Sequence, residues 1–576
     1  MNKIYRINII TLAAIIIALT FSFSAFNVGE NSKQQLPVVT DKNHTNKAAE
    51  LVNSRKTLFS FRDVSLFTKN QKDNQQALTS FVSEASFLMI DKSALRDVNI
   101  SKPENINFRL KDADGKDMEV ELVNVELIPN NFKIKVIGSK GVSYQDFKGG
   151  LYYRGIIKGD NNSTATLSIF ENNVIGIFSS DNGNYVLGSV KNESNQLTDE
   201  YIFYNDRDVT DKPDFVCGVG DSYNSKYYRG SVNNTITGNN RGTTSPVGIY
   251  FVCDYRMYLD NGSNINNVAQ FVTGAFNHVK TLYLNEQLTV EISDIGVYDS
   301  PDPYVNLNTS ISILEEFGFQ TQNTFTGDLA HLLSTRQNNF GGIAWVNVLC
   351  QSYEPTSRSG RYAFSNIDNN YQPYPVYSFT IEVITHETGH NYGSMHTQAC
   401  VWPVFQSGIG AIDSCVQAEN GTCFSFNDIR ANNNGTIMSY CHLNGAINFN
   451  LGFGTLPGDT IRLGYALALC LDSALNSSET PLAFNLLQNY PNPFNPGTNI
   501  KFSLPEEGFV TLKMYDLLGR EIATLINNNH YSIGIFSYSL DASSYNLASG
   551  VYLYKLDVNK DNKSVYSQIK KMVLVK

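Results

Sequence analysis

The stretch HETGHNYGSMH, at residues 386–396, constrains this chain more than any other feature of its sequence. His386 and His390 are four residues apart, so on a helix both rings project from one face about one turn from each other. Gly393 can end that helix in a left-handed conformation, and the turn can return His396 toward the same point. The spacing predicts three nitrogen ligands for one metal ion; a set of hydrogen-bonded core histidines is the alternative.

The residue after the first histidine gives this predicted metal site a chemical role. Glu387 would lie beside the metal without needing to touch it, which is where a general base for a bound water belongs. Three protein ligands leave a fourth position for water, and this arrangement is typical of catalytic zinc sites rather than structural ones. We therefore predict one Zn²⁺ per chain and a catalytic role for Glu387.

Length, composition and charge limit the architecture and the partners. At 576 residues the chain is too long for one core, and usual domain sizes predict about three or four units. The net charge of −10 argues against a nucleic-acid partner, because such a partner needs a basic face. Tyrosine (32 residues) and phenylalanine (34 residues) are plentiful, which favours β-structure.

Residues 1–25 predict a signal peptide. Lys3 and Arg6 precede a mainly apolar run from Ile9 to about Phe23, and small residues near its end offer a cleavage site. A membrane anchor is the alternative, but the run is short for a span and no second hydrophobic segment follows. We therefore expect an exported protein with no transmembrane span in its mature form.

Three segments of different character follow the predicted signal. Residues 26–57 are polar and rich in Lys, Asn and Gln, so we expect a disordered leader. Residues 58–220 alternate apolar and polar positions around DG, NN and NG turns, a pattern that predicts hairpins in a β-rich region. Ser, Asn, Gly and Thr then dominate, and residues 221–244 are expected to form an exposed, cleavable linker.

Between residues 245 and 473 the apolar pattern changes from strand to helix and back. VGIYFVCDYRMYL and LTVEISDIGVY predict strands, while apolar residues in NINNVAQFVTGAFNHVKTLYLNE recur at helical spacing. LAHLLST predicts a helix and GGIAWVNVL another strand. The order favours an α/β (α+β) domain with a mixed twisted sheet, in which FTIEVITHETGHN is the helix with the first two histidines.

The end of the chain has a different pattern. Residues 474–483 form a second polar linker. Residues 484–576 alternate apolar and polar positions between turn residues, which predicts an all-β sandwich. We therefore expect a multidomain protein in which an α/β domain lies between two β-rich regions in the sequence.

The histidine motif resembles that of the metzincin metalloproteases, in which a methionine turn lies beneath the zinc. GTIMSYCH, at residues 435–442, matches this turn with Met438 as its methionine; a methionine that only fills the core is the alternative. The fit is best to the reprolysin-like (adamalysin-like) group, and it covers roughly residues 245–473. The resemblance implies hydrolysis of peptide bonds in proteins or peptides.

The same resemblance implies a substrate cleft beside an open sheet edge. In the family, the strand that matches GGIAW pairs with the peptide substrate. Gly342, Ile343 and Ala344 are therefore expected to bind the substrate through backbone hydrogen bonds.

Three positions depart from the reprolysin pattern. Thr397 follows the third histidine, where the family usually has Asp. Gly248 stands at about the position of an acidic calcium ligand, which leaves Ca²⁺ open despite a possible match at Asp328. Tyr440, two residues after Met438, is placed as in astacins and serralysins, where a tyrosine ligates zinc and swings to hold the oxyanion. We hypothesise that Tyr440 supports the oxyanion; a packed turn tyrosine is the alternative.

A cysteine precedes the predicted linker. DFVCGVGD, at residues 214–221, resembles the cysteine switch of metzincin propeptides, and the region before it looks like a reprolysin propeptide. The resemblance implies that the Cys217 thiolate takes the fourth zinc position in a latent form. A structural disulfide, for instance with Cys253, is the alternative.

Six of the eight cysteines crowd into one part of the chain, which in an exported protein predicts disulfides rather than free thiols. They are Cys350, Cys400, Cys415, Cys423, Cys441 and Cys470. In the reprolysin family the cysteine after the edge strand pairs with one after the last helix, which implies Cys350 with Cys470. The other four allow three pairings, of which we favour Cys400–Cys441 with Cys415–Cys423.

The tail resembles the type IX secretion sorting domain of Gram-negative bacteria. NYPNPFNP, YDLLGRE and SGVYLYKL carry the resemblance, which covers residues 484–576. It implies recognition by the type IX secretion machinery and passage across the outer membrane, followed by cleavage of the tail or attachment to the cell surface. A fibronectin-like binding module is the alternative.

Together these features predict a secreted zinc metalloendopeptidase made as a latent zymogen. A cell-surface adhesin or binding protein with a non-catalytic zinc site is the rival from another class, and the intact Glu387 argues against it. The residues do not separate a narrow processing enzyme from a broad degradative protease, because specificity depends on loops around the cleft.

Overall fold

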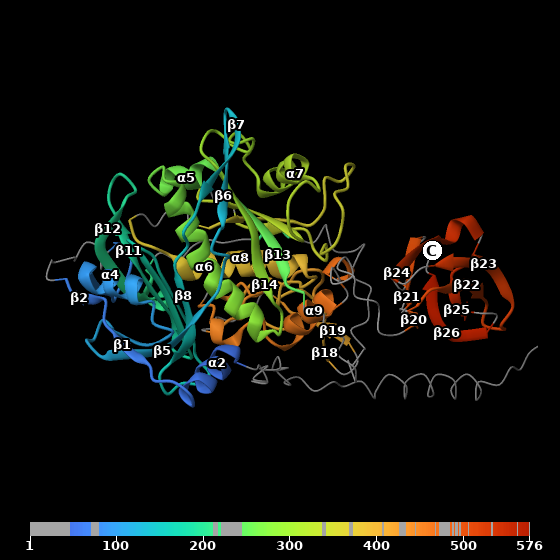
Figure 1. Cartoon of the computed structure of the whole chain (residues 1–576), viewed down its shortest axis with the longest axis horizontal. Helices are drawn as coiled ribbons and strands as arrows, with labels where there is room; N and C mark the ends of the chain where they lie inside the picture. Colours follow the sequence, from blue (N-terminus) through green and yellow to red (C-terminus); the bar gives the residue numbers. More distant parts are fainter. Residues whose placement is uncertain are drawn as a thin grey trace, which may run out of the picture. The chain divides into compact units, whose positions relative to one another are not determined.

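A computed structural model describes most of the chain from residue 46 onward (Figure 1). The described residues are 46–70, 80–210, 217–219, 245–336, 341–367, 373–405, 408–425, 434–443, 445–466, 468–471, 484–486, 489, 494, 497–504, 506–531, 534–545, 547–560 and 563–574. The predicted signal peptide, most of the predicted leader and both predicted linkers lie outside these residues.

A ten-stranded sheet forms the N-terminal region, residues 46–210, and confirms its β-rich character. In sheet order the strands are β1 (Arg62–Val64), β4 (Asn105–Lys111), β5 (Asp117–Val125), β8 (Leu151–Ile157), β9 (Thr164–Ile169), β10 (Val174–Ser180), β11 (Gly183–Lys191), β12 (Leu197–Asn205), β3 (Ser86–Ile90) and β2 (Phe67–Lys69). The predicted DG hairpin joins β4 to β5 and places Lys111 opposite Asp117. Helix α4 (Lys92–Ser101) lies between β3 and β4 in the sequence.

The expected disordered leader is wrong for its last residues, because Lys47–Lys56 form helix α2. The Asn46 side chain caps this helix by accepting a hydrogen bond from the Ala49 amide. The helix packs on β5 and β8 through a small apolar cluster of Ala48, Ala49, Val52, Val123 and Ile156. The polar composition of the segment suggested disorder, although three apolar residues, Ala48, Ala49 and Val52, pack it against the sheet.

A mixed sheet of seven strands forms the framework of the central region, residues 245–471. In sheet order the strands are β16 (Ile343–Ala344), β17 (Tyr362–Asn366), β15 (Leu329–Ser334), β13 (Val247–Cys253), β14 (Val290–Tyr298), β6 (Lys133–Gly138) and β7 (Gly141–Asp146). The strands from β17 to β6 are parallel to one another, while β16 and β7 run antiparallel at the two edges. The predicted mixed α/β character is therefore present.

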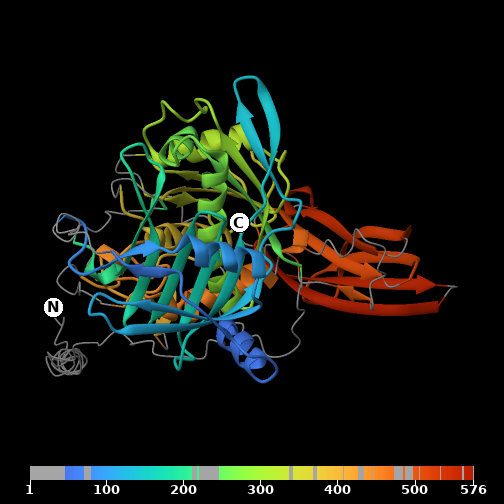
Figure 2. The ribbon, with the colours of Figure 1, turned by 60° about the vertical axis from the view of Figure 1, so that its left-hand side comes forward.

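Two strands of this sheet come from the N-terminal region. Strand β6 pairs in parallel with β14, with Ile134 opposite Ile295, and β7 folds back on β6. Figure 2 shows this hairpin extending beyond its neighbours. Alternation in the sequence predicts that the residues are strands but not which sheet they join, because strand pairing is decided by tertiary packing.

The helix predicted for LAHLLST is wrong, because Leu329–Ser334 form strand β15. This strand lies between β13 and β17, and all six of its residues are buried. Both faces of a central parallel strand are covered, so its sequence is a continuous apolar run without alternation. The helix preference of Leu and Ala is overridden by this pairing.

Within the described part of the central region, five α-helices accompany the seven-stranded sheet: α5 (Tyr255–Asp260), α6 (Ile265–Asn285), α7 (Ser310–Thr321), α8 (Tyr377–Asn391) and α9 (Thr455–Ala466). Helix α6, which the sequence predicted, lies between the two sheets (Figure 1). It contacts β8, β9 and β10 on one side and β6 and β14 on the other. Among the described residues, none of the helices combines the length and apolar character needed to cross a bilayer.

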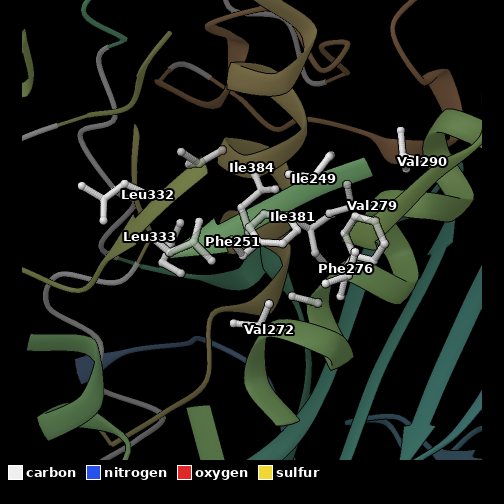
Figure 3. Close-up of a cluster of buried hydrophobic side chains, with 14 of the residues drawn as sticks. Ile249, Phe251, Val272, Phe276, Val279, Val290, Leu332, Leu333, Ile381 and Ile384 are labelled. Atoms are coloured by element: carbon white, nitrogen blue, oxygen red, sulfur yellow. The ribbon is translucent and has the colours of Figure 1, made fainter. Parts of the chain in front are cut away.

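A close-packed cluster fixes helix α8 against the sheet. Figure 3 shows Ile381 and Ile384 of α8 beside Ile249 and Phe251 of β13, with Phe276 of α6 next to them. All five side chains are almost fully excluded from solvent. Burial of side chains of this size contributes about 1.5–3 kcal/mol each. Helix α8 is thus a rigid support for any group on its other face.

The C-terminal region, residues 484–574, is all-β, as the sequence predicted. One sheet holds β20 (Asn485–Leu486), β21 (Gly497–Leu504) and β24 (Gly534–Asp541), and the other holds β23 (Glu521–Tyr531), β22 (Gly508–Tyr515), β25 (Gly550–Lys560) and β26 (Lys563–Leu574). Side chains from both sheets, among them Phe502, Leu512 and Leu556, share one hydrophobic core. Two sheets around one core make a sandwich.

Candidate metal centre

Helix α8 holds two histidines in the protein interior. All 15 of its residues are buried, so its polar side chains need partners inside the protein. His386 and His390 lie one turn apart with their Nε2 atoms 3.2 Å from each other. Gly393, at φ 107°, turns the chain after the helix. The turn brings His396 Nε2 to 3.1 Å from His390 Nε2.

The outer nitrogen of each ring has an oxygen partner. These partners are the Ile437 carbonyl for His386 Nδ1 (2.8 Å), the Ser394 carbonyl for His390 Nδ1 (2.7 Å) and the Glu419 carboxylate for His396 Nδ1 (2.7 Å). Because a carbonyl or an ionised carboxylate only accepts, each Nδ1 is placed to donate, and Nε2 is the nitrogen left to face a metal ion. Three Nε2 atoms that meet at one point fit a cation, and neutral imidazole is the form that ligates zinc.

The interior position also favours the neutral rings. Burial lowers the pKa of His386 and His390 well below the ordinary range, and the neighbouring imidazoles lower it further. A buried histidine resists protonation because the charged form loses its hydration. Both rings are therefore in the form that binds metal at neutral pH.

Cys217 completes the group. Its Sγ atom lies 3.5 Å from His390 Nε2 and 3.5 Å from Glu387 Oε2. This sulfur and one nitrogen of each of the three histidines all lie within 4.8 Å of one another. Burial and the charge of Glu387 raise the pKa of the thiol. A divalent cation beside the sulfur would act in the opposite direction, because it favours the thiolate. The alternative disulfide between Cys217 and Cys253 is absent, and both thiols are free.

Glu387 faces the same point and is fully buried. Within the described residues, its Oε1 atom has no hydrogen-bond partner. Burial raises its pKa well above the ordinary value. A Cβ atom at Gly342 would lie 2.1 Å from Glu387 Oε1, so only glycine leaves room for the carboxylate there. An unpartnered carboxylate in a buried site is costly unless another group uses it.

The methionine turn lies directly beneath helix α8. Met438 is fully buried, and its carbonyl accepts the Thr397 amide hydrogen bond (3.1 Å). A Cβ atom at Gly389 would come within 2.8 Å of Met438 Sδ, so the glycine permits this close approach. The Tyr440 ring centroid lies 4.7 Å from that of His396. The structure therefore brings both predicted turn residues to the histidines.

The predicted edge strand is present but short. Strand β16, Ile343–Ala344, is the edge of the seven-stranded sheet and pairs only with β17 among the described strands. The Gly218 amide, next to Cys217, donates a hydrogen bond to the Gly342 carbonyl (2.8 Å). The segment that contains Cys217 is thus hydrogen-bonded to the backbone of Gly342, the residue before β16.

The positions considered for calcium are close together. The Gly248 amide donates a hydrogen bond to Asp328 Oδ2 at 2.8 Å. Glycine offers no side-chain ligand, and this contact occupies one carboxylate oxygen of Asp328. This hydrogen bond gives the Asp328 carboxylate a structural role that does not require a bound ion.

Three disulfides are present, and one part of the predicted pairing is wrong. Cys350 bonds to Cys470, as the resemblance implied. The other two bonds are Cys400–Cys423 and Cys415–Cys441, not Cys400–Cys441 and Cys415–Cys423. Cys415, at one end of the segment 415–423, bonds to Cys441 just after the methionine turn, and Cys423, at the other end, bonds to Cys400 in the turn after His396. Sequence spacing does not reveal this pairing.

Sequence reasoning missed two residues that touch the site. Glu419 accepts the His396 Nδ1–H hydrogen bond, and Trp402 Nε1 donates one to the His396 carbonyl (2.8 Å). Neither belongs to the histidine motif. The one available clue for Glu419 was that an acidic residue lies between two cysteines of the cluster.

Three imidazoles whose Nε2 atoms converge, a buried carboxylate and a neighbouring sheet edge are the parts of a zinc-dependent peptidase site. Residues 243–449 match the family model described as metallo-peptidase family M12. This part of the chain is therefore a reprolysin-like M12 metallopeptidase domain, and the protein is a zinc metalloprotease. Residues 488–574 match the model of the secretion system C-terminal sorting domain, so both resemblances are confirmed.

Several solved structures are distantly similar to the chain. Metalloproteinase-II from Bacteroides fragilis is 11% identical with a TM-score of 0.30, over 57% of this chain and 91% of that one. Archaemetzincin from Methanopyrus kandleri is 16% identical with a TM-score of 0.19, over 29% and 85%. OgpA from Akkermansia muciniphila is 11% identical with a TM-score of 0.19, over 59% and 95%.

Proposed function

We propose that this zinc metalloprotease is a secreted endopeptidase made as a latent zymogen. In this proposal the chain comprises a signal peptide (1–25), a leader (26–57, with α2 at its end), a propeptide (58–220), a linker (221–244), a catalytic domain (245–473), a second linker (474–483) and a sorting domain (484–576). The observation that supports the catalytic assignment best is the convergence of three histidine Nε2 atoms on one point beside Glu387.

His386, His390 and His396 would hold the zinc ion. When bound there, zinc supplies a Lewis acid that polarises the peptide carbonyl and makes water a better nucleophile at neutral pH. Because the three rings are fixed by hydrogen bonds to their outer nitrogens, they need not reorganise when the ion binds.

Glu387 would be the general base and then the general acid. Its Oε1 atom lacks a hydrogen-bond partner within the described residues, so it is available to take a proton from the attacking water. The same carboxyl then passes the proton to the leaving amine. Burial raises its pKa, which makes the carboxylate a stronger proton acceptor than one in water.

Tyr440 would support the oxyanion. Its hydroxyl donates a hydrogen bond to the Cys217 carbonyl (3.1 Å) and accepts one from the Cys217 amide (2.8 Å). The hydroxyl is therefore aimed at backbone groups of the segment that occupies the site. When a substrate replaces this segment, the same O–H can donate to the carbonyl oxygen under attack.

The substrate would be a protein or peptide in an extended conformation. The Gly218 amide already bonds to the Gly342 carbonyl, as the backbone of a substrate would. Gly342, Ile343 and Ala344 are proposed to extend this pairing by strand addition. Backbone pairing tolerates many side chains, so sequence preference would come from neighbouring loops.

Latency would depend on Cys217. Its thiolate would take the fourth zinc position and exclude water until the linker at 221–244 is cut. The sorting domain indicates secretion or attachment at the cell surface, and we propose that it directs the chain through the type IX machinery of a Gram-negative bacterium.

The test compares three full-length chains: wild type, Cys217→Ala, and Cys217→Ala with Glu387→Ala. We expect each to bind zinc, and only the Cys217→Ala chain to cleave a broad peptide library rapidly. The double variant should hold zinc without cleaving, because its general base is gone. Equal cleavage by the single and double variants would exclude Glu387 as the base. Zinc binding without cleavage by the single variant would favour the binding-protein alternative.

A further inference from the structure

One of the three histidines has a partner unlike the others. His386 and His390 donate to backbone carbonyls, whereas His396 donates to the side-chain carboxylate of Glu419 at 2.7 Å. A carboxylate acceptor is charged, so the hydrogen bond is stronger and draws more proton density from the ring. The opposite nitrogen of His396 then becomes a better donor to a metal ion.

Glu419 is held in place from several directions. Gln398 Nε2 donates to its second oxygen, Glu419 Oε1, at 2.9 Å. Its carbonyl accepts the Cys400 amide (2.7 Å), and its amide donates to the Gln398 carbonyl (3.3 Å). The Cys400–Cys423 disulfide closes the same short segment four residues beyond Glu419. Both carboxylate oxygens and the backbone are thus fixed, which is more than a solvated surface glutamate requires.

We propose that Glu419 is a positioning residue for the third zinc ligand. It fixes the Nδ1–H tautomer and the ring plane of His396, and its charge strengthens zinc binding. This inference rests on the proposed zinc site. Reprolysins usually have Asp as the residue after the third histidine, and this chain has Thr397 there. A residue distant in sequence therefore supplies a carboxylate that the motif itself lacks.

The experiment measures the zinc dissociation constant of the full-length chain by competition with a chelator. Glu419→Ala should weaken zinc binding by about 10–100-fold, the usual loss for an outer-shell partner. Glu419→Gln should lose less, because its amide oxygen can still accept from Nδ1 but carries no charge. The visible spectrum of the Co²⁺-substituted chain should shift in both variants, which a purely structural role would not produce.

Glu382→Gln is the matched control. Glu382 is another buried glutamate beside a histidine, with Oε1 at 3.1 Å from His442 Nδ1, and His442 is not a proposed ligand. We expect this variant to keep the zinc affinity and the Co²⁺ spectrum of wild type. Thermal unfolding of the zinc-free chains shows whether each variant is folded.

The outcomes separate the two proposals. If wild type and His390→Ala bind zinc equally, the proposed zinc site itself is wrong. If wild type binds one zinc ion per chain and both Glu419 variants bind it as tightly, the positioning role is wrong. A loss shared equally by Glu382→Gln also contradicts it, because the effect would then come from general loosening of the domain.

An independent observation concerns the C-terminal region. The turn between β22 and β23 exposes two adjacent leucines, Leu517 (65% exposed) and Leu518 (80% exposed). The turn is well formed without them. Asp516 Oδ1 accepts the amides of Leu518 and Arg520 (2.9 Å each), and Gly519 adopts φ 78°. Neither leucine packs in the core, so the fold does not account for them.

We infer that this leucine turn, residues 516–520, is a contact point for the secretion machinery. A rigid protrusion with two apolar side chains fits an apolar groove on a partner protein, and little conformational entropy is lost when it binds. The partner follows from the family match, because a sorting domain has to be recognised by the apparatus that exports it. This inference rests on the proposed export function.

The test expresses full-length chains in a Gram-negative host that has the type IX machinery and measures the ratio of protein in the medium to protein in the cell. Leu517→Ser with Leu518→Ser should lower this ratio at least tenfold. Val565→Ser with Ile569→Ser is the matched control, since both residues are exposed on β26, and it should be exported like wild type. Resistance of the retained protein to proteolysis shows that the sandwich is folded.

Deletion of residues 484–576 separates the two ideas. If the deleted chain is exported normally, the region is not the export signal and the proposed function of the tail is wrong. If the deletion blocks export but the leucine variant is exported like wild type, only the leucine turn is excluded as the contact. Loss of self-association instead of export in the leucine variant would also overturn the inference.

Discussion

Two groups of buried histidines in the central region differ in one respect. His386, His390 and His396 are fully buried, and so are His278 on α6 and His331 on β15. Burial lowers the pKa of His278 and of His331 to about 3, so these two rings are neutral as well. Burial is therefore common to both groups, and so is the lowered pKa that His386 and His390 share with His278 and His331.

The two groups differ in the partners of their ring nitrogens. His331 Nε2 lies 2.7 Å from Ser365 Oγ and its Nδ1 lies 3.3 Å from Thr388 Oγ1, so hydroxyls that can donate or accept serve both nitrogens. In the other group, carbonyl and carboxylate oxygens contact the outer nitrogens, and the three Nε2 atoms face one another. A perturbed pKa alone does not identify a functional histidine, because structural histidines have one too. The convergence of several Nε2 atoms on one point is the feature that separates the two groups.

The largest expected effect comes from removing one of the three converging histidines. His390→Ala removes one of three converging donors and should weaken zinc binding by well over the roughly 100-fold that an outer-shell change costs. His278→Ala should leave zinc binding unchanged and lower stability by about 2–4 kcal/mol, through a cavity and a lost contact to Thr166. Zinc content after dialysis and thermal unfolding check the two results. Similar zinc loss in both variants would show that burial, not convergence, matters.

The next effect extends the comparison to tyrosines. Tyr440→Phe should lower turnover by about 100-fold with zinc retained, because a donor to the oxyanion is removed. Tyr392 is also buried near the end of α8, but its hydroxyl has no hydrogen-bond partner within the described residues. Tyr392→Phe should therefore turn over peptides like wild type. Both are measured as kcat in chains that also carry Cys217→Ala, and unchanged turnover in Tyr440→Phe would exclude the oxyanion role.

Local motifs explain which parts of this site could be predicted from the sequence. Helix geometry places His386, Glu387 and His390, and the positive φ of the following turn requires Gly393. The positions of these four residues therefore depend on their neighbours in the sequence. The alternating β4–β5 hairpin was predictable for the same reason.

Long-range packing explains the rest. Glu419 meets His396 in a segment that two disulfides and backbone hydrogen bonds hold beside the histidines, and no local pattern encodes that path. Strand β15 was mistaken for a helix because a strand buried on both faces lacks alternation. Hairpin β6–β7 has ordinary alternation, but its choice of sheet depends on the free edge of β14.

Removing one disulfide gives a smaller effect that tests how the third histidine is held. Cys400→Ala with Cys423→Ala should weaken zinc binding by about tenfold, because Glu419 loses part of its support. Cys350→Ala with Cys470→Ala opens a longer loop and should cost about 2–5 kcal/mol of stability while zinc affinity is retained. Chelator competition and thermal unfolding distinguish the variants. Wild-type zinc affinity after loss of Cys400–Cys423 would show that the backbone hydrogen bonds alone hold Glu419.

The smallest effect concerns the histidines that do not converge. The folded-state pKa of His331 is lowered to about 3, so below pH 6.5 the unfolded chain takes up a proton that the folded chain refuses. Its contribution to stability is therefore complete above pH 6.5 and is lost as pH falls toward 3, by about 1.4 kcal/mol per pH unit. His331→Asn should make the thermal midpoint less dependent on pH between 6.5 and 5. An identical pH profile for wild type and His331→Asn would mean that His331 is protonated in the folded chain, and its hydroxyl partners would then have to act as acceptors.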